Sequence, residues 1–288
     1  MGHAVYERGR IIPVVDLDDL VKSALAEDLG RGDLTSRAVI APDVRCRATA
    51  LAKAAGVVSG LIPFSRTFTE VDASVVVELL VEDGDEVEEG TELAHVSGPA
   101  RSVLAAERVA LNFLGHLSGV ATLTRRYVRE CEGTGSAILC TRKTLPGLRA
   151  LEREAVGHGG GRLHRAGLDD GILIKDNHVR LAGGVAEAVS RAKENAPHTL
   201  RIEVEVETLD QLEEALSAGS DVVLLDNADL DTVKRAVEVV DGRAPLEVSG
   251  GVRLEDVADL ASAGDVLISV GRLTHSAPAL DVSLELEG

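Results

Sequence analysis

The feature that most constrains the fold is an alternation of short apolar segments with helical segments after residue 107. Six apolar segments recur, AILCTRKT, GILIKDNH, RIEVEVE, DVVLLDN, PLEVSGG and DVLISVGRL, and helical segments such as LDQLEEALSAG separate most of them. Strand–helix alternation with glycine at the helix ends is typical of parallel βα units, and short repeats favour a barrel over an open sheet. Because residues 107–275 have room for only six or seven strands, the sequence predicts an incomplete, TIM-like α/β barrel.

The first hundred residues follow a different pattern. The segment DLDDLVKSALAEDL has helical spacing, and shorter strand-like segments separated by glycines follow it. One of these, VEDGDEVEEGTELAHVSG, resembles the hairpins of biotinyl or lipoyl carrier domains, which present a modifiable lysine at a hairpin tip. No lysine occurs between Lys53 and Lys143. We therefore interpret residues 1–106 as a small α+β domain without the carrier function.

The overall charge and the absence of targeting signals limit the partners. A formal net charge of −18 argues against nucleic acid and anionic membranes, which both carry dense negative charge. No apolar run has the length of a membrane span, and the N-terminal sequence MGHAVYERGR lacks the apolar region of a signal peptide. Three cysteines without metal-like spacing are expected to be reduced, structural thiols. We therefore expect a cytoplasmic protein.

The charge is unevenly distributed along this acidic chain. Between Arg101 and Arg180 there are thirteen cations and eight anions, a local net charge of +5. Part of this basic region is the glycine-rich segment GHGGGRLHRAGLDDGILIKDNH. A local excess of cations indicates a binding site for an anion. The alternative is a set of salt bridges on a helix surface, which we favour for Arg125, Arg126 and Arg129.

Charged or glycine residues follow nearly every predicted strand, where the active site of an α/β barrel lies. Arg142 and Lys143 are adjacent at the end of the first of these strands. A guanidinium fork matches a carboxylate in a bidentate manner, whereas lysine presents a point charge that suits phosphate. These two residues are therefore candidates for binding an anionic substrate, with a pair of exposed surface cations as the alternative.

Acidic residues occupy the next strand ends. In RIEVEVE, Glu203, Glu205 and Glu207 share one face of the strand, and we expect them to point into the barrel. Buried carboxylates require cations, and Lys143, Lys175 and Mg²⁺ are the expected partners. The alternative is an edge strand with a solvated acidic face. In VVLLDN, Asp226 is placed to hold Mg²⁺ or ribose hydroxyls, unless it caps a helix instead.

The last two strand ends, VSGG and SVGR, are turns of small residues. Exposed backbone N–H groups next to a helix N-terminus suit a phosphate, and TIM-type barrels commonly bind phosphate at their last two strands. His164 and His178 lack the spacing of metal ligands, so catalytic zinc is not expected. Residues alone therefore indicate a phosphoribosyl-transferring or phosphosugar enzyme, without identifying the acceptor.

The order of the motifs resembles that of a known family. The segments are EDLGRGDLTS, ERVALNFLGHLSGVAT, TRKTLPGLR, GGGRLHRAGLDDGILIKDNH, IEVEVETLDQ, VVLLDN, VSGG and ISVGRLTHSAPALDVSLEL. They resemble quinolinate phosphoribosyltransferases from about Glu27 to Leu286. The resemblance implies that quinolinate and phosphoribosyl pyrophosphate react, with Mg²⁺, to give nicotinate mononucleotide, CO₂ and pyrophosphate in NAD synthesis. It also implies a sandwich-like domain of residues 1–106, rejoined by residues 276–288, and a catalytic barrel of residues 107–275.

The resemblance further implies a homodimer, sometimes assembled further, and a role for each matching residue. Arg108 would be lent to the site by the partner subunit, and the quinolinate pocket would be lined by Arg142, His164 and Arg165. Phosphoribosyl pyrophosphate and its Mg²⁺ would be handled by Lys143, Lys175, Glu205 and Asp226. The 5′-phosphate would be held by Ser249, Gly250, Gly251 and Gly271, with His275. The resemblance assigns no role to Asp176, Asn177 and His178, and our own hypothesis is that they support Lys175.

Four alternative functions make different predictions about the site. A nicotinate phosphoribosyltransferase would bind a monocarboxylate and need fewer arginines than Arg108, Arg142 and Arg165 supply. The family's paralogue that is associated with molybdenum transport remains an alternative. A phosphosugar isomerase or aldolase would not consume phosphoribosyl pyrophosphate. A binding or carrier protein would carry a lipoyl or biotinyl group, against which the missing tip lysine and the charged strand ends argue.

Overall fold

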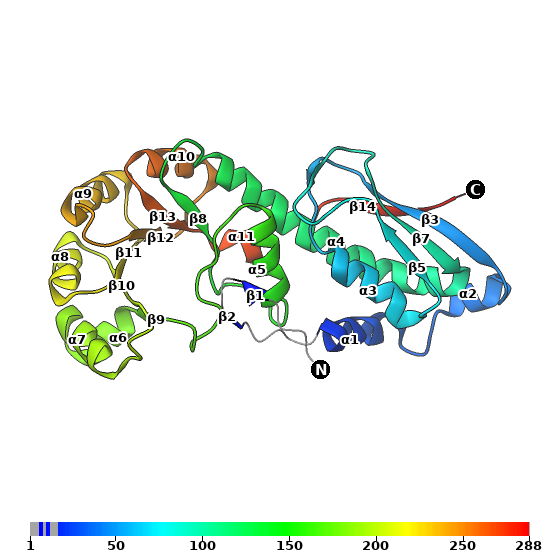
Figure 1. Cartoon of the computed structure of the whole chain (residues 1–288), viewed down its shortest axis with the longest axis horizontal. Helices are drawn as coiled ribbons and strands as arrows, with labels where there is room; N and C mark the ends of the chain where they lie inside the picture. Colours follow the sequence, from blue (N-terminus) through cyan, green and yellow to red (C-terminus); the bar gives the residue numbers. More distant parts are fainter. Residues whose placement is uncertain (1–5, 8–9, 12–16, 288) are drawn as a thin grey trace. The chain divides into compact units, whose positions relative to one another are not determined.

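The computed structural model describes residues 6–7, 10–11 and 17–287, which form two compact units (Figure 1). The first unit comprises the chain up to Arg125, Leu145–Gly160 and the segment from Ser276 onward, and the second comprises Arg126–Thr144 and Gly161–His275. Part of the predicted N-terminal domain, residues 1–5, 8–9 and 12–16, lies outside the described residues. The first boundary between the two units falls between Arg125 and Arg126, inside a long helix. This boundary is later in the sequence than the predicted one at residue 107.

The first unit is built on a four-stranded antiparallel sheet, in the order β14-β3-β7-β5. These strands are β3 (Arg45–Ala52), β5 (Val76–Leu79), β7 (Glu92–Pro99) and β14 (Val282–Leu286). Two short pairs accompany it, β1 (Tyr6–Glu7) with β2 (Arg10–Ile11), and β4 (Gly56–Val57) with β6 (Glu86–Val87). Because β14 pairs with β3, the end of the chain returns to the domain in which the chain begins.

Five helices of the described residues belong wholly or partly to this unit. They are α1 (Leu17–Leu29), α2 (Leu34–Val39), α3 (Leu61–Val71), α4 (Ala100–Arg129) and α5 (Arg149–His158). Phe64 and Phe68 of α3 pack edge to face and lie in one apolar cluster with Leu93 of β7 and Leu114 of α4. The predicted helix near residue 17 is confirmed. The long predicted helix beginning at Glu107 is also confirmed, but it starts earlier, at Ala100.

The second unit is a curved sheet of six parallel strands, in the order β8-β13-β12-β11-β10-β9. The strands are β8 (Ala137–Leu139), β9 (Ile172–Ile174), β10 (Ile202–Val206), β11 (Val222–Asp226), β12 (Leu246–Ser249) and β13 (Val266–Ser269). The sheet ends at β8 and β9 without closing, so the predicted incomplete barrel is confirmed, with one strand from each of the six apolar segments.

Helices line the outer side of this curved sheet (Figure 1). They are α7 (Val185–Asn195), α8 (Leu209–Ala218), α9 (Leu230–Val240) and α10 (Leu254–Ser262), and two short helices, α6 (Asp176–Ala182) and α11 (Arg272–His275), follow β9 and β13. Val204, Val223 and Ile268, fully buried, lie on the face that packs against the helices. The alternate residues of the same strands, among them Glu203, point to the barrel interior. No helix of the described residues is long and apolar enough to cross a membrane.

Candidate active site

The predicted site residues of the second unit lie at the carboxyl ends of successive strands. The residues and their positions are Arg142 and Lys143 after β8, Lys175 after β9, Glu205 in β10, Asp226 at the end of β11, Ser249 to Gly251 at the end of β12, and Gly271 and His275 after β13. This convergence follows from the parallel register, because carboxyl ends of parallel strands meet at one edge. Arg108 lies in the part of α4 that belongs to the first unit.

Two arginines share the loop side of this edge and are incompletely paired. The Arg165 guanidinium donates from Nη1 to the Gly171 carbonyl at 2.9 Å. The Nε atoms of Arg142 and Arg165 are buried, and neither has a hydrogen-bond partner within the described part of the chain. Burial, followed by the nearby Arg142 charge, lowers the pKa of Arg165. Two adjacent cations with free donors form a site that an anion, above all a carboxylate, would neutralise and satisfy.

Lys175 and Glu205 form an ion pair across neighbouring strands. Ile174 of β9 pairs with Val204 of β10, so Lys175 follows at the level of Glu205, and Lys175 Nζ contacts Glu205 Oε2. The Glu205 side chain is 13% exposed and that of Lys175 45%, so the pair presents its cation to solvent. The prediction that three glutamates point inward is correct for Glu203 and Glu205. It is wrong for Glu207, which is exposed because the strand ends at Val206.

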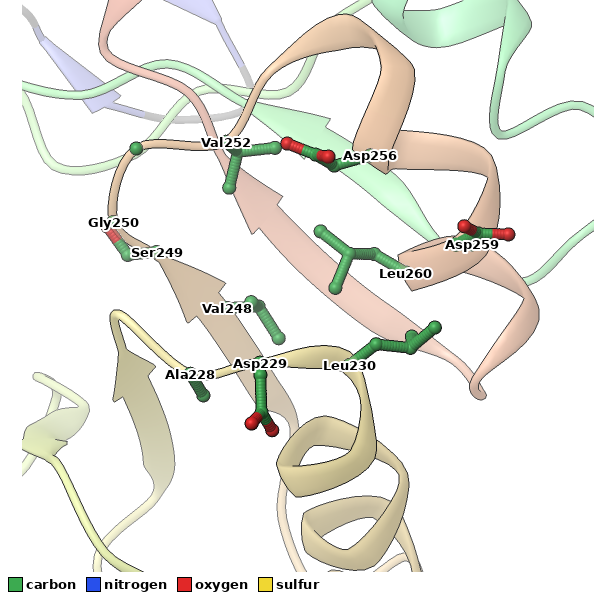
Figure 2. A pocket seen from close by; sticks show the side chains of 11 residues that line it. Ala228, Asp229, Leu230, Val248, Ser249, Gly250, Val252, Asp256, Asp259 and Leu260 are labelled. Atoms are coloured by element: carbon green, nitrogen blue, oxygen red, sulfur yellow. The ribbon is translucent and has the colours of Figure 1, made fainter.

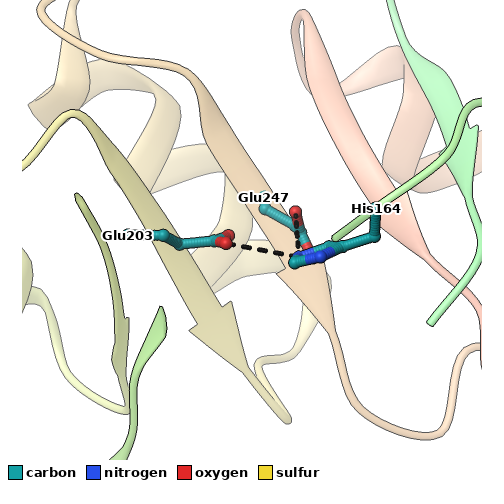
Figure 3. Close-up of side chains that lie close together, drawn as sticks. All are labelled: His164, Glu203 and Glu247. Carbon is teal, nitrogen blue, oxygen red and sulfur yellow. Dashed lines mark ion pairs between the residues drawn. The ribbon is translucent and has the colours of Figure 1, made fainter. Parts of the chain in front are cut away.

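A second, deeper cluster lies inside the barrel, where His164 meets Glu203 and Glu247 (Figure 3). His164 Nε2 is 3.2 Å from Glu203 Oε2 on β10 and 3.6 Å from Glu247 Oε2 on β12. The Ser269 hydroxyl of β13 donates to Glu247 Oε1 at 2.6 Å. Sequence reasoning predicted that Glu203 points into the barrel, but with Lys143, Lys175 or Mg²⁺ as its partner rather than His164, and it assigned no role to Glu247. The available signal was the alternation in LEVS, which places Glu247 on the same side of the strand as Ser249.

Burial governs the acid–base behaviour of this cluster. Burial and then the Glu203 charge raise the pKa of Glu247 from 4.5 to about 8. Burial lowers the pKa of His164, but a hydrogen bond with Glu203 and the charges of both glutamates outweigh it, so the net shift is upward. A backbone contact opposes a second proton on this imidazole, because the Arg165 N–H donates to His164 Nδ1 at 2.7 Å. An Nδ1 that accepts this N–H requires the neutral tautomer of His164, with its proton on Nε2.

Helix α6, which follows β9, fixes the backbone at its N-cap residue Lys175. His178 Nδ1 accepts the Lys175 N–H at 2.9 Å, in the arrangement expected for a supporting residue. The Asn177 side chain instead accepts from Arg180 Nη2 at 2.9 Å. Of the three residues for which support of Lys175 was expected, His178 therefore has a direct contact with it, and Asn177 is engaged with Arg180.

Asp226, at the end of β11, is not the N-cap of the following helix α9. Asp229, not Asp226, caps α9 by accepting the Thr232 N–H at 2.8 Å. Asp226 Oδ2 accepts from the side-chain amide of Asn227 at 2.6 Å and is partly buried. The competing prediction of a cap is therefore wrong for Asp226, and its carboxylate remains available at the strand end.

Glycine turns follow the last two strands. Gly250 and Gly251 have φ of 100° and 60°, in the left-handed region that favours glycine, and a Cβ on Gly250 would lie 2.6 Å from the Asn227 backbone nitrogen. After β13, a Cβ on Gly271 would lie 3.0 Å from Lys143 Cδ and 3.3 Å from His275 Nε2. The structure thus brings Gly271, Lys143 and His275 together.

A pocket of about 230 Å³ adjoins the first of these turns (Figure 2). It is lined by Leu230, Leu260 and the turn itself, and also by three carboxylates, Asp229, Asp256 and Asp259. Negative charge disfavours a phosphate at this position. We therefore do not assign the phosphate site to this pocket, although Ser249, Gly250 and Gly251 form part of its wall.

The carboxylates at the strand ends suit a magnesium ion only in part. Within the described residues, the group of potential ligands that lies within 4.8 Å is His164, Glu203 and Glu247, which does not include Glu205 or Asp226. Magnesium commonly uses one or two carboxylates and completes its shell with water and substrate phosphates. Glu205 and Asp226 on adjacent strands fit a metal bound largely through its substrate, rather than a cage made by the protein alone.

The fold and the site together define a class, the incomplete α/β barrel enzymes with an anion site at the strand ends. Comparison with known proteins narrows this class. The model of the quinolinate phosphoribosyl transferase N-terminal domain matches residues 33–118, and that of the C-terminal domain matches residues 120–285. The chain therefore belongs to the quinolinate phosphoribosyltransferase family.

Individual relatives agree over nearly the whole length. A probable nicotinate-nucleotide pyrophosphorylase (carboxylating) of Bacillus subtilis is 42% identical over 272 residues, which cover 94% of each chain. The mitochondrial quinolinate phosphoribosyltransferase (decarboxylating) 2b of Nicotiana tabacum is 41% identical over 96% of this chain and 83% of its own. The solved nicotinate-nucleotide pyrophosphorylase of Francisella tularensis is 35% identical and superimposes with a TM-score of 0.92, over 98% of this chain and 100% of its own.

Proposed function

We propose that this protein transfers the phosphoribosyl group of phosphoribosyl pyrophosphate to quinolinate with loss of CO₂. The products are nicotinate mononucleotide and pyrophosphate, and the reaction belongs to NAD biosynthesis. Within the family to which the chain belongs, one observation carries the choice of acceptor. Arg142 and Arg165 hold two buried Nε donors that have no partner in the described structure, and an aromatic dicarboxylate supplies acceptors for both.

The acceptor pocket consists, in this proposal, of Arg142, Arg165 and His164, together with Arg108 of the partner subunit. The arginines bind the quinolinate carboxylates and fix the ring with its nitrogen toward the ribose. Loss of CO₂ leaves an electron pair on the ring carbon next to a cationic nitrogen, and the surrounding guanidinium groups favour that distribution of charge. His164 contributes through its backbone contact with Arg165 at 2.7 Å.

The donor site consists of Lys143, Lys175, Glu205 and Asp226. Ribosyl transfer passes through an oxocarbenium-like carbon, which a nearby carboxylate stabilises. Lys175 forms an ion pair with Glu205 and offers its charge to the phosphates. Mg²⁺, held by Glu205 and Asp226 and by the substrate, would neutralise negative charge on the departing pyrophosphate. Catalysis is then electrostatic, without a covalent enzyme intermediate.

The 5′-phosphate site comprises Ser249, Gly250, Gly251 and Gly271, with His275. The support is the left-handed backbone at Gly250 and Gly251, which leaves N–H groups unshielded by side chains, and the proximity of His275 to Gly271. The protein acts as a cytoplasmic homodimer in this proposal, because Arg108 is supplied across the interface.

The direct test is product formation by the purified full chain. Incubation with quinolinate, phosphoribosyl pyrophosphate and Mg²⁺ should give nicotinate mononucleotide, CO₂ and pyrophosphate in equal amounts. Nicotinate in place of quinolinate should give no detectable product, and omission of Mg²⁺ should abolish turnover. Turnover with nicotinate but not with quinolinate would contradict the proposed acceptor. Capture of a covalent ribosyl–enzyme adduct would contradict the proposed mechanism.

A further inference from the structure

The deep cluster of His164, Glu203, Glu247 and Ser269, called here the inner cluster, is not used by the proposed function except through His164. It lies inside the barrel rather than at its rim. Glu203 is 8% exposed and Glu247 2% exposed. Two carboxylates are rarely buried together unless cations or protons compensate them, because desolvation penalises both charges. The negative charge of the cluster must therefore be offset by a cation or by a proton bound to one of the carboxyl groups.

The hydrogen-bond donors of the cluster are fewer than its acceptors. The two carboxyl groups offer four oxygens. Their donors include the His164 Nε2–H, which faces one oxygen of each carboxyl group, and the Ser269 hydroxyl, which donates to Glu247. Glu203 Oε1 is buried and has no hydrogen-bond partner in the described structure. An additional proton on a carboxyl oxygen would supply the missing donor and remove one charge.

His164 is a poor place for that proton. Its Nδ1 accepts the backbone N–H of Arg165 at 2.7 Å, and a protonated Nδ1 would set two donors against each other. Its Nε2 already carries the proton directed at the glutamates. The imidazole is therefore neutral, and it links the two carboxyl groups on one side to the Arg165 backbone on the other.

We propose that Glu247 holds this proton and that Glu203 and Glu247 are positioning residues, which orient His164 and through it Arg165. The inference rests on the proposed function only in that Arg165 binds the acceptor. With Glu247 neutral, the cluster carries one negative charge near Arg165. With Glu247 ionised, a second charge would repel Glu203, and the arginines would be drawn toward the glutamates instead of toward a dicarboxylate.

The surroundings of Glu247 favour the neutral form. The titratable groups facing it are Glu203 on β10 and His164, Ser269 donates to it from β13, and β11 contributes the apolar Leu224 at the same level. Burial and the Glu203 charge raise the pKa of Glu247 to about 8. The proton is therefore retained at neutral pH and lost above about pH 8.

The state of the cluster can be measured without any turnover. In the full-length protein labelled with ¹⁵N-histidine, His164 should show an unprotonated Nδ1 and a protonated Nε2 at pH 7. With ¹³C-carboxyl glutamate, one resonance should titrate near pH 8 and should be missing from Glu247→Gln. Glu213→Gln, which alters an exposed glutamate paired with Arg243, is the matched control and should retain that resonance.

Three results would overturn the proposal. They are a doubly protonated His164 at pH 7, the absence of any glutamate that titrates above pH 7, and stoichiometric Zn²⁺ in the purified protein that Glu247→Gln removes. Zinc would occupy Nε2 and replace the proton. None of these readouts needs quinolinate, so failure of the proposed reaction leaves this test intact.

Kinetics distinguish positioning from a merely structural role. Glu247→Ala should raise KM for quinolinate about tenfold, as for loss of one hydrogen bond to a charged group, with little change in KM for phosphoribosyl pyrophosphate. Glu247→Gln resembles the protonated acid and should restore most of that loss while removing the decline in quinolinate affinity above pH 8. If Glu247→Gln is no better than Glu247→Ala, or if both substrates lose affinity equally, Glu247 does not act in this way.

Discussion

Arg165 joins two regions of the site, which makes its substitution informative. Its backbone contacts His164, its Nη1 contacts the Gly171 carbonyl, and its Nε is left for a ligand. We expect Arg165→Ala to raise KM for quinolinate about 30-fold or more, because a charge-assisted bidentate contact is lost, with little effect on phosphoribosyl pyrophosphate. Steady-state kinetics with each substrate varied checks this. Arg191→Ala, which removes an exposed arginine paired with Glu187, is the control; equal losses for both substrates would refute the role.

The proton on Glu247 also makes the free energy of unfolding depend on pH. The folded state raises the pKa of Glu247 from 4.5 to about 8, so between these values the folded state binds a proton that the unfolded state releases. Stability contributed by this proton is complete below pH 4.5 and is lost as pH rises to about 8, with a slope approaching 1.4 kcal/mol per pH unit. Glu247→Gln lacks this term, so its free energy of unfolding relative to wild type should increase from pH 5 to pH 8 and level above. Urea unfolding across this range tests it; a pH-independent difference would contradict the assignment.

At the scale of elements, the turn after β12 depends on glycine. Gly250 has φ of 100°, and a Cβ there would lie 2.6 Å from the Asn227 backbone nitrogen. Gly242 has φ of 72°, and a Cβ there would meet no atom within 4 Å. Gly242→Ala should cost about 1 kcal/mol of unfolding free energy from backbone strain alone, and Gly250→Ala about 1–3 kcal/mol more because of the collision. Equal losses in thermal unfolding would show that the turn adjusts freely.

The individual elements also explain why some predictions from the sequence were correct and others were not. All six barrel strands were predictable, because each is a short apolar run between turn signals. The face of β10 was predictable from its strict alternation, but the inward direction of Glu207 was not, since it depends on where the strand ends. Glu247 was missed although the alternation in LEVS places it on the side of Ser249, because its partners Glu203 and His164 are distant in sequence.

At the scale of the whole molecule, the proposed dimer can be tested by mixing inactive subunits. Arg108→Ala and Lys175→Ala should each be inactive as homodimers. If Arg108 serves the partner's site, a mixed dimer contains one site with both native residues. Purified mixed dimers should then have about half of the wild-type activity, and the unseparated random mixture about a quarter. The measurement is turnover of mixed dimers, purified by different tags on the two chains; no recovery in such dimers would place Arg108 outside the partner's site.

The sequence by itself determined the kind of structure and its family. Period-two and helical patterns depend on neighbouring residues, so alternating strands and helices, the incomplete barrel and the ordered motifs from TRKTLPG to VSGG were all readable along the chain. Only the tertiary structure decided which charges meet. It paired Lys175 with Glu205, placed His164 between Glu203 and Glu247, and left the Nε donors of Arg142 and Arg165 buried without a partner in the described residues. The reason is physical: burial and Coulomb energy depend on distance in space, which sequence separation does not give.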